Sequence, residues 1–112
     1  MTLFEKIAAR EIPARIVCET DDYLAFHDVN PQAPVHILIV PKRAIPRIAD
    51  AEPGDADLLG RMLLASRGIA AAAGLAEGGY RLVINNGPDA GESVPHLHIH
   101  LLGGRGLQWP PG

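Results

Sequence analysis

The chain has 112 residues, of which 47% are hydrophobic, and this predicts one globular domain over residues 1–112 rather than a disordered chain. Its formal net charge of −3 gives no electrostatic basis for binding nucleic acid or an anionic membrane. The single cysteine, Cys18, excludes an intrachain disulfide and a cysteine-based zinc knuckle.

The N-terminal half predicts one short helix followed by three strands. An amphipathic helix is expected over Thr2–Arg10, with Thr2 as its N-cap and Pro13 preventing its continuation. Three apolar, β-prone runs then predict strands. The first two form a hairpin, and a loop with two prolines precedes the third. These runs are Ile16–Glu19, Tyr23–His27 and Val35–Val40.

The C-terminal half predicts an irregular segment at 46–54, one long helix and two more strands. The helix is expected over Asp55–Ala73, with Gly74 at the C′ position. One strand is expected over Tyr80–Asn85, followed by an Asn-Gly turn and a loop. The last strand carries three histidines and precedes a tail at 103–112. Clustered strands and few helices predict an α+β fold with a mostly antiparallel sheet.

The last strand contains the most informative motif, in which His96, His98 and His100 alternate with apolar residues. A strand has a period of two, so the three rings are expected on one face, and Leu97, Ile99 and Leu101 point into the core. Neighbouring rings would lie roughly 6.5–7 Å apart, too far for direct bonding. This spacing suits a row of imidazoles along an extended anion such as a phosphate chain.

Three interpretations of the histidine row are open. In the first, the rings are surface residues of a half-exposed strand. In the second, they form a metal site. The metal interpretation needs rings that converge on one point, and the strand has no acidic residue to complete the ligand set. In the third interpretation the middle ring is the nucleophile of phosphoryl or nucleotidyl transfer, because imidazole is partly neutral near pH 7.

The motif His-Leu-His-Ile-His-Leu-Leu resembles the signature of the histidine-triad superfamily, and the flanking segments resemble its Hint branch of purine nucleotide-binding hydrolases. The similarity runs from about Leu3 to the end of the chain. It implies a five-stranded, mostly antiparallel sheet with one long and one short helix. It also implies a homodimer in which two sheets join into one of ten strands. The supporting segments are 26–28, 31–36, 40–42, 85–87, 91–94, 102–105 and 109–112.

The resemblance implies catalytic roles for five residues. His98 matches the nucleophile that attacks the α-phosphorus and forms a nucleotidyl-histidine. His100 matches the ring that contacts phosphate oxygens, where its protonated form would offset negative charge. His96 matches the ring that orients the nucleophile through its own carbonyl, and His36 matches a fourth histidine from the neighbouring strand. Ser93 matches a hydroxyl near the leaving group.

The resemblance also implies a nucleotide-binding site. Asp28 resembles the carboxylate that accepts both ribose hydroxyls, and Asn85 resembles an amide on the phosphate and ribose side. His27 and Val94 lie within the matching segments. An apolar slot for the base is matched by Leu3, Phe4, Ile7, Phe26 and Val29.

The activity implied is hydrolysis of the P–N bond of adenosine or guanosine 5′-phosphoramidates, without cofactor or metal. The partners implied are purine nucleotides and a second copy of the chain. Two alternatives are a Fhit-like dinucleoside polyphosphate hydrolase and a nucleotide-binding regulatory module with incidental turnover. Pro95 and Leu107-Gln108 depart from the family pattern and bear on leaving-group preference. No signal sequence or membrane span is evident, so we expect a cytoplasmic location.

Overall fold

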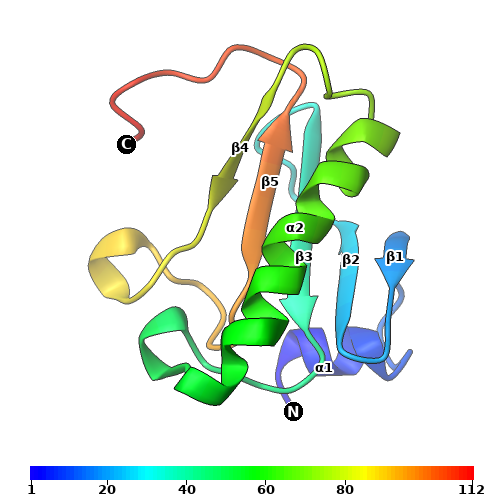
Figure 1. Cartoon of the computed structure of the whole chain (residues 1–112), viewed down its shortest axis with the longest axis vertical. Coiled ribbons are helices and arrows are strands. Elements are labelled where there is room, and N and C mark those ends of the chain that lie inside the picture. The colour runs from blue at the N-terminus through cyan, green and yellow to red at the C-terminus, as the bar shows by residue number, and fades with distance from the viewer.

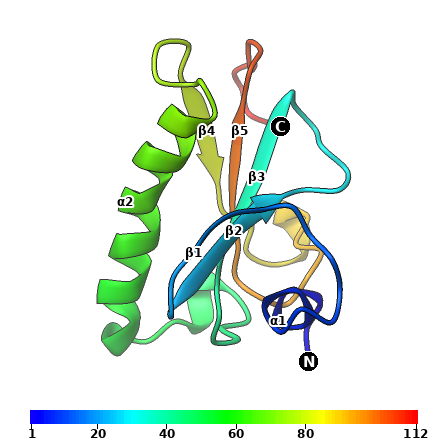
Figure 2. The same cartoon turned by 90° about the vertical axis from the view of Figure 1, so that its right-hand side faces the viewer.

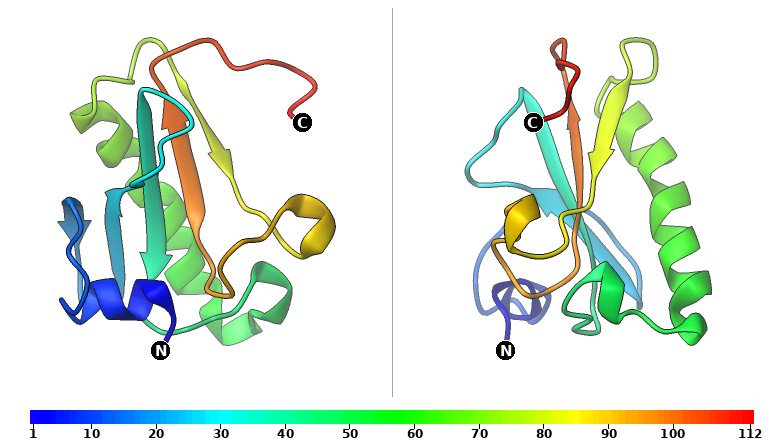
Figure 3. Two further views of the ribbon diagram at one scale, coloured as in Figure 1. Left: turned by 180° about the vertical axis from the view of Figure 1, so that it is seen from behind. Right: turned by 90° about the vertical axis from the view of Figure 1, so that its left-hand side faces the viewer.

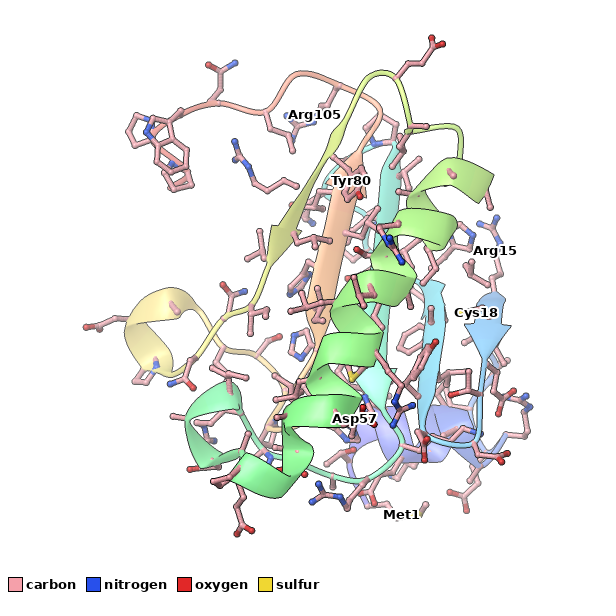
Figure 4. The ribbon with its side chains drawn as sticks, in the orientation of Figure 1. Met1, Arg15, Cys18, Asp57, Tyr80 and Arg105 are labelled. Carbon is pink, nitrogen blue, oxygen red and sulfur yellow. The ribbon has the colours of Figure 1, made fainter.

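The two predicted helices and five predicted strands are all present in the computed structural model, which describes residues 1–112. The strands form one antiparallel sheet in the order β1-β2-β3-β5-β4. Cys18 on β1 and Tyr80 on β4 mark its two edges (Figure 4). The elements are α1 (Leu3–Ala8), β1 (Ile16–Glu19), β2 (Tyr23–His27), β3 (Val35–Pro41), the 3-10 turns η1 (Ile48–Asp50) and η2 (Pro53–Asp55), α2 (Ala56–Ala72), β4 (Tyr80–Val83), the 3-10 turn η3 (Pro88–Ala90) and β5 (Ile99–Gly103).

The two helices lie on opposite faces of the sheet (Figure 1, Figure 2). One face packs against α2, and its core includes Met62, Ile39 and Leu101. The other face packs against α1, and its core includes Phe4 and Leu38. Alternation along β3 accounts for this division, because successive side chains of a strand point to opposite faces. The β3–β5 register sets His100 opposite Leu38, so His100 lies on the face that α1 covers.

Helix α1 begins where its capping signal predicts, and α2 ends where Gly74 predicts. Thr2 is the N-cap of α1, where its hydroxyl accepts from the Glu5 amide while the Glu5 carboxylate accepts from the Thr2 amide. This reciprocal capping box satisfies two amides that the first turn leaves free. After α2, Gly74 has a φ of +81°. This is the left-handed conformation that glycine tolerates at the C′ position.

The structure differs from the sequence-based expectation most clearly in three places. The last strand begins at Ile99, so His96 and His98 precede the ladder, and His96 lies in a bend. Pairing stops there because Pro41 has no amide to donate, and the Leu97 amide instead donates to the Ile45 carbonyl at 2.7 Å. Strand β4 ends at Val83 rather than at residue 85, and segment 46–54 contains 3-10 structure rather than only irregular chain.

The C-terminal tail leaves β5 and extends past the β4 edge of the sheet (Figure 3). Its Trp109 side chain is 81% exposed. Arg81 of β4 donates to the Gln108 carbonyl at 2.9 Å and so ties the tail to the edge strand. Neither helix combines the length and the apolar character that crossing a membrane requires.

Candidate active site

Four of the five histidines gather on the face of the sheet opposite α2. His36 comes from β3, His100 from β5, and His96 and His98 from the segment that leads into β5. His96 is 0% exposed and His98 is 5% exposed, so they are not surface residues of a half-exposed strand. The centroids of the His98 and His100 rings are 4.8 Å apart. The expected spacing of 6.5–7 Å was therefore wrong for the rings, since His98 lies outside the regular ladder.

One hydrogen-bond chain fixes the tautomers of His96 and His98. His96 Nε2 lies 2.7 Å from the carbonyl oxygen of Pro41, which only accepts, so Nε2 carries the proton. His96 Nδ1 then accepts from the Thr2 hydroxyl at 2.6 Å. His98 Nδ1 lies 2.7 Å from the His96 carbonyl and must donate to it. The neutral His98 ring therefore carries its free lone pair on Nε2.

A second chain fixes the tautomers of His36 and His100. The Gln32 amide donates to His36 Nδ1 at 3.0 Å, so the neutral His36 ring has its proton on Nε2. His36 Nε2 in turn donates to His100 Nδ1 at 2.9 Å. The remaining proton of His100 is thus on Nε2, which is buried and has no hydrogen-bond partner in the protein. A buried donor without a partner points to a ligand acceptor, because such groups are rarely left unpaired.

Burial disfavours the charged form of three rings in this network. It lowers the pKa of His96 and of His36, although the neighbouring charges of Glu5 and Asp28 act in the opposite direction. The pKa of His100 falls to about 4, chiefly through burial and further through the charges of His98 and His36. The resemblance implies a protonated form of His100 beside phosphate, and the pKa of about 4 instead favours a neutral ring that offers an N–H donor at neutral pH.

Three side chains of the site lie close enough to hold a metal ion, namely Asp28, His36 and His100, whose ligand atoms lie within 4.8 Å of one another. Their hydrogen bonds do not fit that use. A metal on His36 Nε2 would move the ring proton to Nδ1, where it would face the Gln32 amide donor. His36 Nε2 and His100 Nδ1 are also only 2.9 Å apart. Two tetrahedral ligands at about 2.1 Å from zinc need a wider separation.

An apolar pocket opens beside the histidines, between α1 and β2, and all residues predicted for the base slot line it. Leu3, Phe4 and Ile7 come from α1, Phe26 comes from β2, and Val29 follows β2 with 92% of its surface exposed. His27 and Asp28 line it as well. Burial, followed by the charge of Arg15, lowers the pKa of His27. The sequence missed four further lining residues, which are Ile12, Pro13, Ala14 and Leu38.

Asp28 lies between this pocket and the histidines. Its Oδ1 accepts from the Asn30 amide at 2.9 Å, and its Oδ2 lies 3.5 Å from His36 Nε2. Each carboxylate oxygen retains a lone pair for a ligand hydroxyl. Asp28 can therefore cap the loop at the Asn30 amide and still face His36 and a ligand.

Ser93 is exposed and Asn85 is half-buried, and both lie in the segment between β4 and β5. Val94 packs against the core cluster on the α1 face. An ion pair holds this segment: Arg47 Nε and Nη2 donate to the two Glu92 oxygens at 2.9 and 3.1 Å. The paired guanidinium lowers the pKa of Glu92, and the Gly87 amide adds to this effect.

Sequence reasoning missed the groups that orient the rings. The Pro41 carbonyl and the Gln32 amide are backbone groups, and every residue has a carbonyl, so no residue type signals their use. Thr2 was predicted as a helix cap, and nothing in its local sequence indicates a partner 94 positions away. The Arg47–Glu92 pair likewise joins residues 45 positions apart.

Comparisons with known proteins agree with this arrangement. The sequence profile described as HIT domain matches residues 9–107. An uncharacterized HIT-like protein of Synechococcus elongatus is 60% identical over 111 residues, covering 99% of this chain and 96% of that protein. A HIT family hydrolase from Legionella pneumophila Philadelphia 1 has a TM-score of 0.97 at 50% identity, with 100% of both chains covered. A histidine triad nucleotide-binding protein from Candida albicans has a TM-score of 0.84 at 30% identity, over 98% of this chain and 83% of that one.

Proposed function

The chain belongs to the HIT domain family, and on this premise we propose that it is a purine nucleoside phosphoramidase. It would hydrolyse the P–N bond of adenosine or guanosine 5′-phosphoramidates through a nucleotidyl-histidine intermediate, as the Hint branch does. The hydrolase from Legionella pneumophila and the nucleotide-binding protein from Candida albicans support the broader class of nucleotide hydrolase. The observation that carries the proposal is the hydrogen bond from His98 Nδ1 to the His96 carbonyl, which fixes the ring and leaves the lone pair on Nε2.

The proposed first step joins His98 Nε2 to the α-phosphorus while the P–N bond breaks. The nitrogen leaves with the bonding electron pair and takes a proton from solvent, on the side where Ser93 is exposed. The His98 ring becomes positively charged, and its Nδ1–H stays bonded to the His96 carbonyl, which stabilises that charge. Water then attacks phosphorus and loses a proton to solvent, the P–Nε2 bond breaks, and the nucleoside monophosphate is released, so His98 regains its lone pair.

His100 is proposed to stabilise charge on the transferring phosphoryl group. Its unpartnered Nε2–H is a preorganised donor in a buried site, and the chain through His36 keeps the proton on that nitrogen. A fixed donor of this kind costs no reorganisation as charge develops on phosphate oxygens. The role differs from that of a cationic histidine, because the pKa of about 4 leaves His100 neutral.

The nucleoside part is proposed to occupy the α1–β2 pocket. The apolar walls suit a purine base, since burial of an aromatic ring against apolar side chains is favourable. Asp28 at the rim is proposed to accept the ribose hydroxyls, and Asn85 to bond on the phosphate and ribose side. A site built around hydroxyl donors rejects the deoxy analogue because its own polar groups stay unpaired.

We further propose that two chains join through their β4 edges into a ten-stranded sheet. β4 pairs only with β5, so its outer edge has unpaired backbone groups. The exposed side chain of Tyr80 on this edge, at 38%, adds apolar surface that a partner would cover. The tail would then reach the partner's leaving-group side with Trp109. Light scattering of the full chain and of a chain ending at Leu102 tests the dimer and the tail.

A substrate panel tests the activity. Purine nucleoside 5′-phosphoramidates, acyl-adenylates and dinucleoside polyphosphates are compared side by side for wild type, for His98→Ala and for the surface control Glu77→Ala. We expect hydrolysis of the phosphoramidates by wild type and the control. His98→Ala should lose several orders of magnitude in turnover while the affinity for nucleoside monophosphate changes little. Mass spectrometry of quenched wild type should find a nucleotidyl group on His98.

The panel also separates the alternatives. Preferred cleavage of dinucleoside polyphosphates assigns the Fhit-like activity. Tight binding of monophosphate without turnover of any substrate assigns a regulatory module. An active His98→Ala protein would overturn the proposed nucleophile.

A further inference from the structure

The Thr2 hydroxyl takes part in two hydrogen bonds with opposite directions. As the N-cap of α1 it accepts from the Glu5 amide at 3.1 Å. Its own proton is therefore free to donate, and its second contact is His96 Nδ1 at 2.6 Å. Met1, which precedes Thr2, lies near α1 at the bottom of the view in Figure 4. The start of the chain is thus bonded to the histidine segment at the other end of the sequence.

The direction of the Thr2–His96 bond follows from the opposite side of the ring. The Pro41 carbonyl at 2.7 Å requires the proton on His96 Nε2, which leaves Nδ1 as an acceptor. Both ring nitrogens are thereby held by partners from other parts of the fold, so the ring is fixed in orientation as well as in tautomer. His96 is 0% exposed, and loss of the Thr2 donor would leave a buried acceptor unpaired.

The fixed His96 ring bears on the nucleophile through the backbone of the same residue. The His96 carbonyl accepts from His98 Nδ1 at 2.7 Å, and this bond determines where the Nε2 lone pair points. We propose that Thr2 is a positioning residue of the hydrolase, holding His96 so that its carbonyl aims His98 at phosphorus. This inference rests on the proposed function, because it needs His98 as the nucleophile.

The same short helix contacts the nucleophile by packing. The Phe4 ring meets the His96 and His98 rings edge-on, with centroid distances of 5.5 and 5.1 Å. Leu3, Phe4 and Ile7 also line the base pocket. Helix α1 therefore joins the base pocket to the histidines, and Thr2 supplies the hydrogen bond of this connection.

Substitutions at Thr2 separate its two bonds. Thr2→Ser keeps both the cap and the donor. Thr2→Val removes both. Thr2→Gly stays a favourable N-cap residue but has no hydroxyl, so it cannot donate to His96 Nδ1. Glu5→Ala is the matched control, because it removes the other half of the capping box, the 2.9 Å bond from the Thr2 amide, and leaves the hydroxyl in place.

The expected result is a loss in kcat with little change in KM. Thr2→Val and Thr2→Gly should lower kcat about tenfold or more, since misplacing a reacting group by about 1 Å costs about 100-fold. Thr2→Ser and Glu5→Ala should stay near wild type in kcat. Nitrogen-15 NMR of the His96 ring should report a proton on Nε2 alone in wild type and Thr2→Ser. In Thr2→Val and Thr2→Gly the proton should stay on Nε2, where the Pro41 carbonyl accepts it, and the Nδ1 resonance should shift because that nitrogen has lost its donor.

Three results would overturn the proposal. Wild-type kcat in Thr2→Gly would mean that the helix cap suffices, and an equal loss in Glu5→Ala would assign the effect to helix stability. The NMR result is independent of turnover: a wild-type ring with its proton on Nδ1 contradicts the assigned bond. A wild-type protein that hydrolyses no substrate of the panel, yet has the expected His96 tautomer, would refute the proposed activity and, with it, a catalytic role for the bond.

Discussion

Lowering the pH from 7.5 to 5.0 should destabilise the fold through His100. Burial is the main reason that its pKa drops from 6.5 to about 4, and the charges of His98 and His36 contribute. In the unfolded chain the ring takes up a proton near its ordinary pKa. Between pH 6.5 and 4 the unfolded state therefore binds more protons than the folded state. The stability that His100 contributes is complete above pH 6.5 and is lost as the pH falls toward 4.

The magnitude follows from the two pKa values. Their difference of about 2.5 corresponds to about 3.4 kcal/mol once protonation is complete. At pH 5.0 the linkage relation gives about 2 kcal/mol, and solvent at the accessible edge of the ring reduces this to about 1 kcal/mol. His100→Asn is the matched variant, because its amide oxygen still accepts from His36 Nε2 but does not titrate.

Urea unfolding of both proteins at the two pH values measures the effect. Wild type should lose about 1 kcal/mol more of its unfolding free energy than His100→Asn between pH 7.5 and 5.0. The other histidines are present in both proteins, so the comparison isolates His100. Equal losses in the two proteins would refute the reasoning.

Three further predictions concern packing, backbone and substrate choice. Met62 is 0% exposed, so Met62→Ala should lower the free energy of unfolding by about 2–5 kcal/mol, whereas Leu64→Ala on the exposed side of α2 should lower it far less. Similar losses in the two variants would contradict the assignment of Met62 to the core. Gly104 has a φ of +92°, and a Cβ there would lie 2.8 Å from the Pro34 Cβ, so Gly104→Ala should destabilise by about 1–3 kcal/mol; an unchanged unfolding midpoint would argue against strain. Asp28→Asn should remove most of the preference for ribose over deoxyribose monophosphates in calorimetric titration, and a wild type without such a preference would refute the assigned hydroxyl contacts.

The elements that the sequence predicts well are those with an apolar pattern and a terminating residue. Strand β3 is a β-branched run that ends at a proline, and α2 has an apolar stripe and a glycine with positive φ after it. Such signals are local, so they survive without tertiary information. The residues of the base slot were predicted together from the family resemblance, and all of them line the pocket between α1 and β2.

The details of the histidine cluster depend on contacts that no local pattern contains. The predicted ring spacing of an ideal strand was wrong because Pro41 ends the ladder before His98, and the centroids of the His98 and His100 rings then lie 4.8 Å apart. The lowered pKa of His100 has no local sequence signal, because it depends on burial by distant residues and on His36, 64 positions away. The ring tautomers depend on the Pro41 carbonyl and the Gln32 amide. Because these are backbone groups, a pattern of side-chain types does not predict them.

Helix α1 has six residues, and only Phe4 and Ile7 of them are buried. A segment with so little buried surface is expected to open locally far more often than β3 and β5, whose amides should exchange with solvent only when the whole domain unfolds. Each opening would remove one wall of the nucleotide pocket and release His96 from Thr2. A nucleotide seated against α1 binds only the closed state, so it should slow amide exchange in this helix more than anywhere in the sheet. The substrate would in this way complete the folding of the site that acts on it.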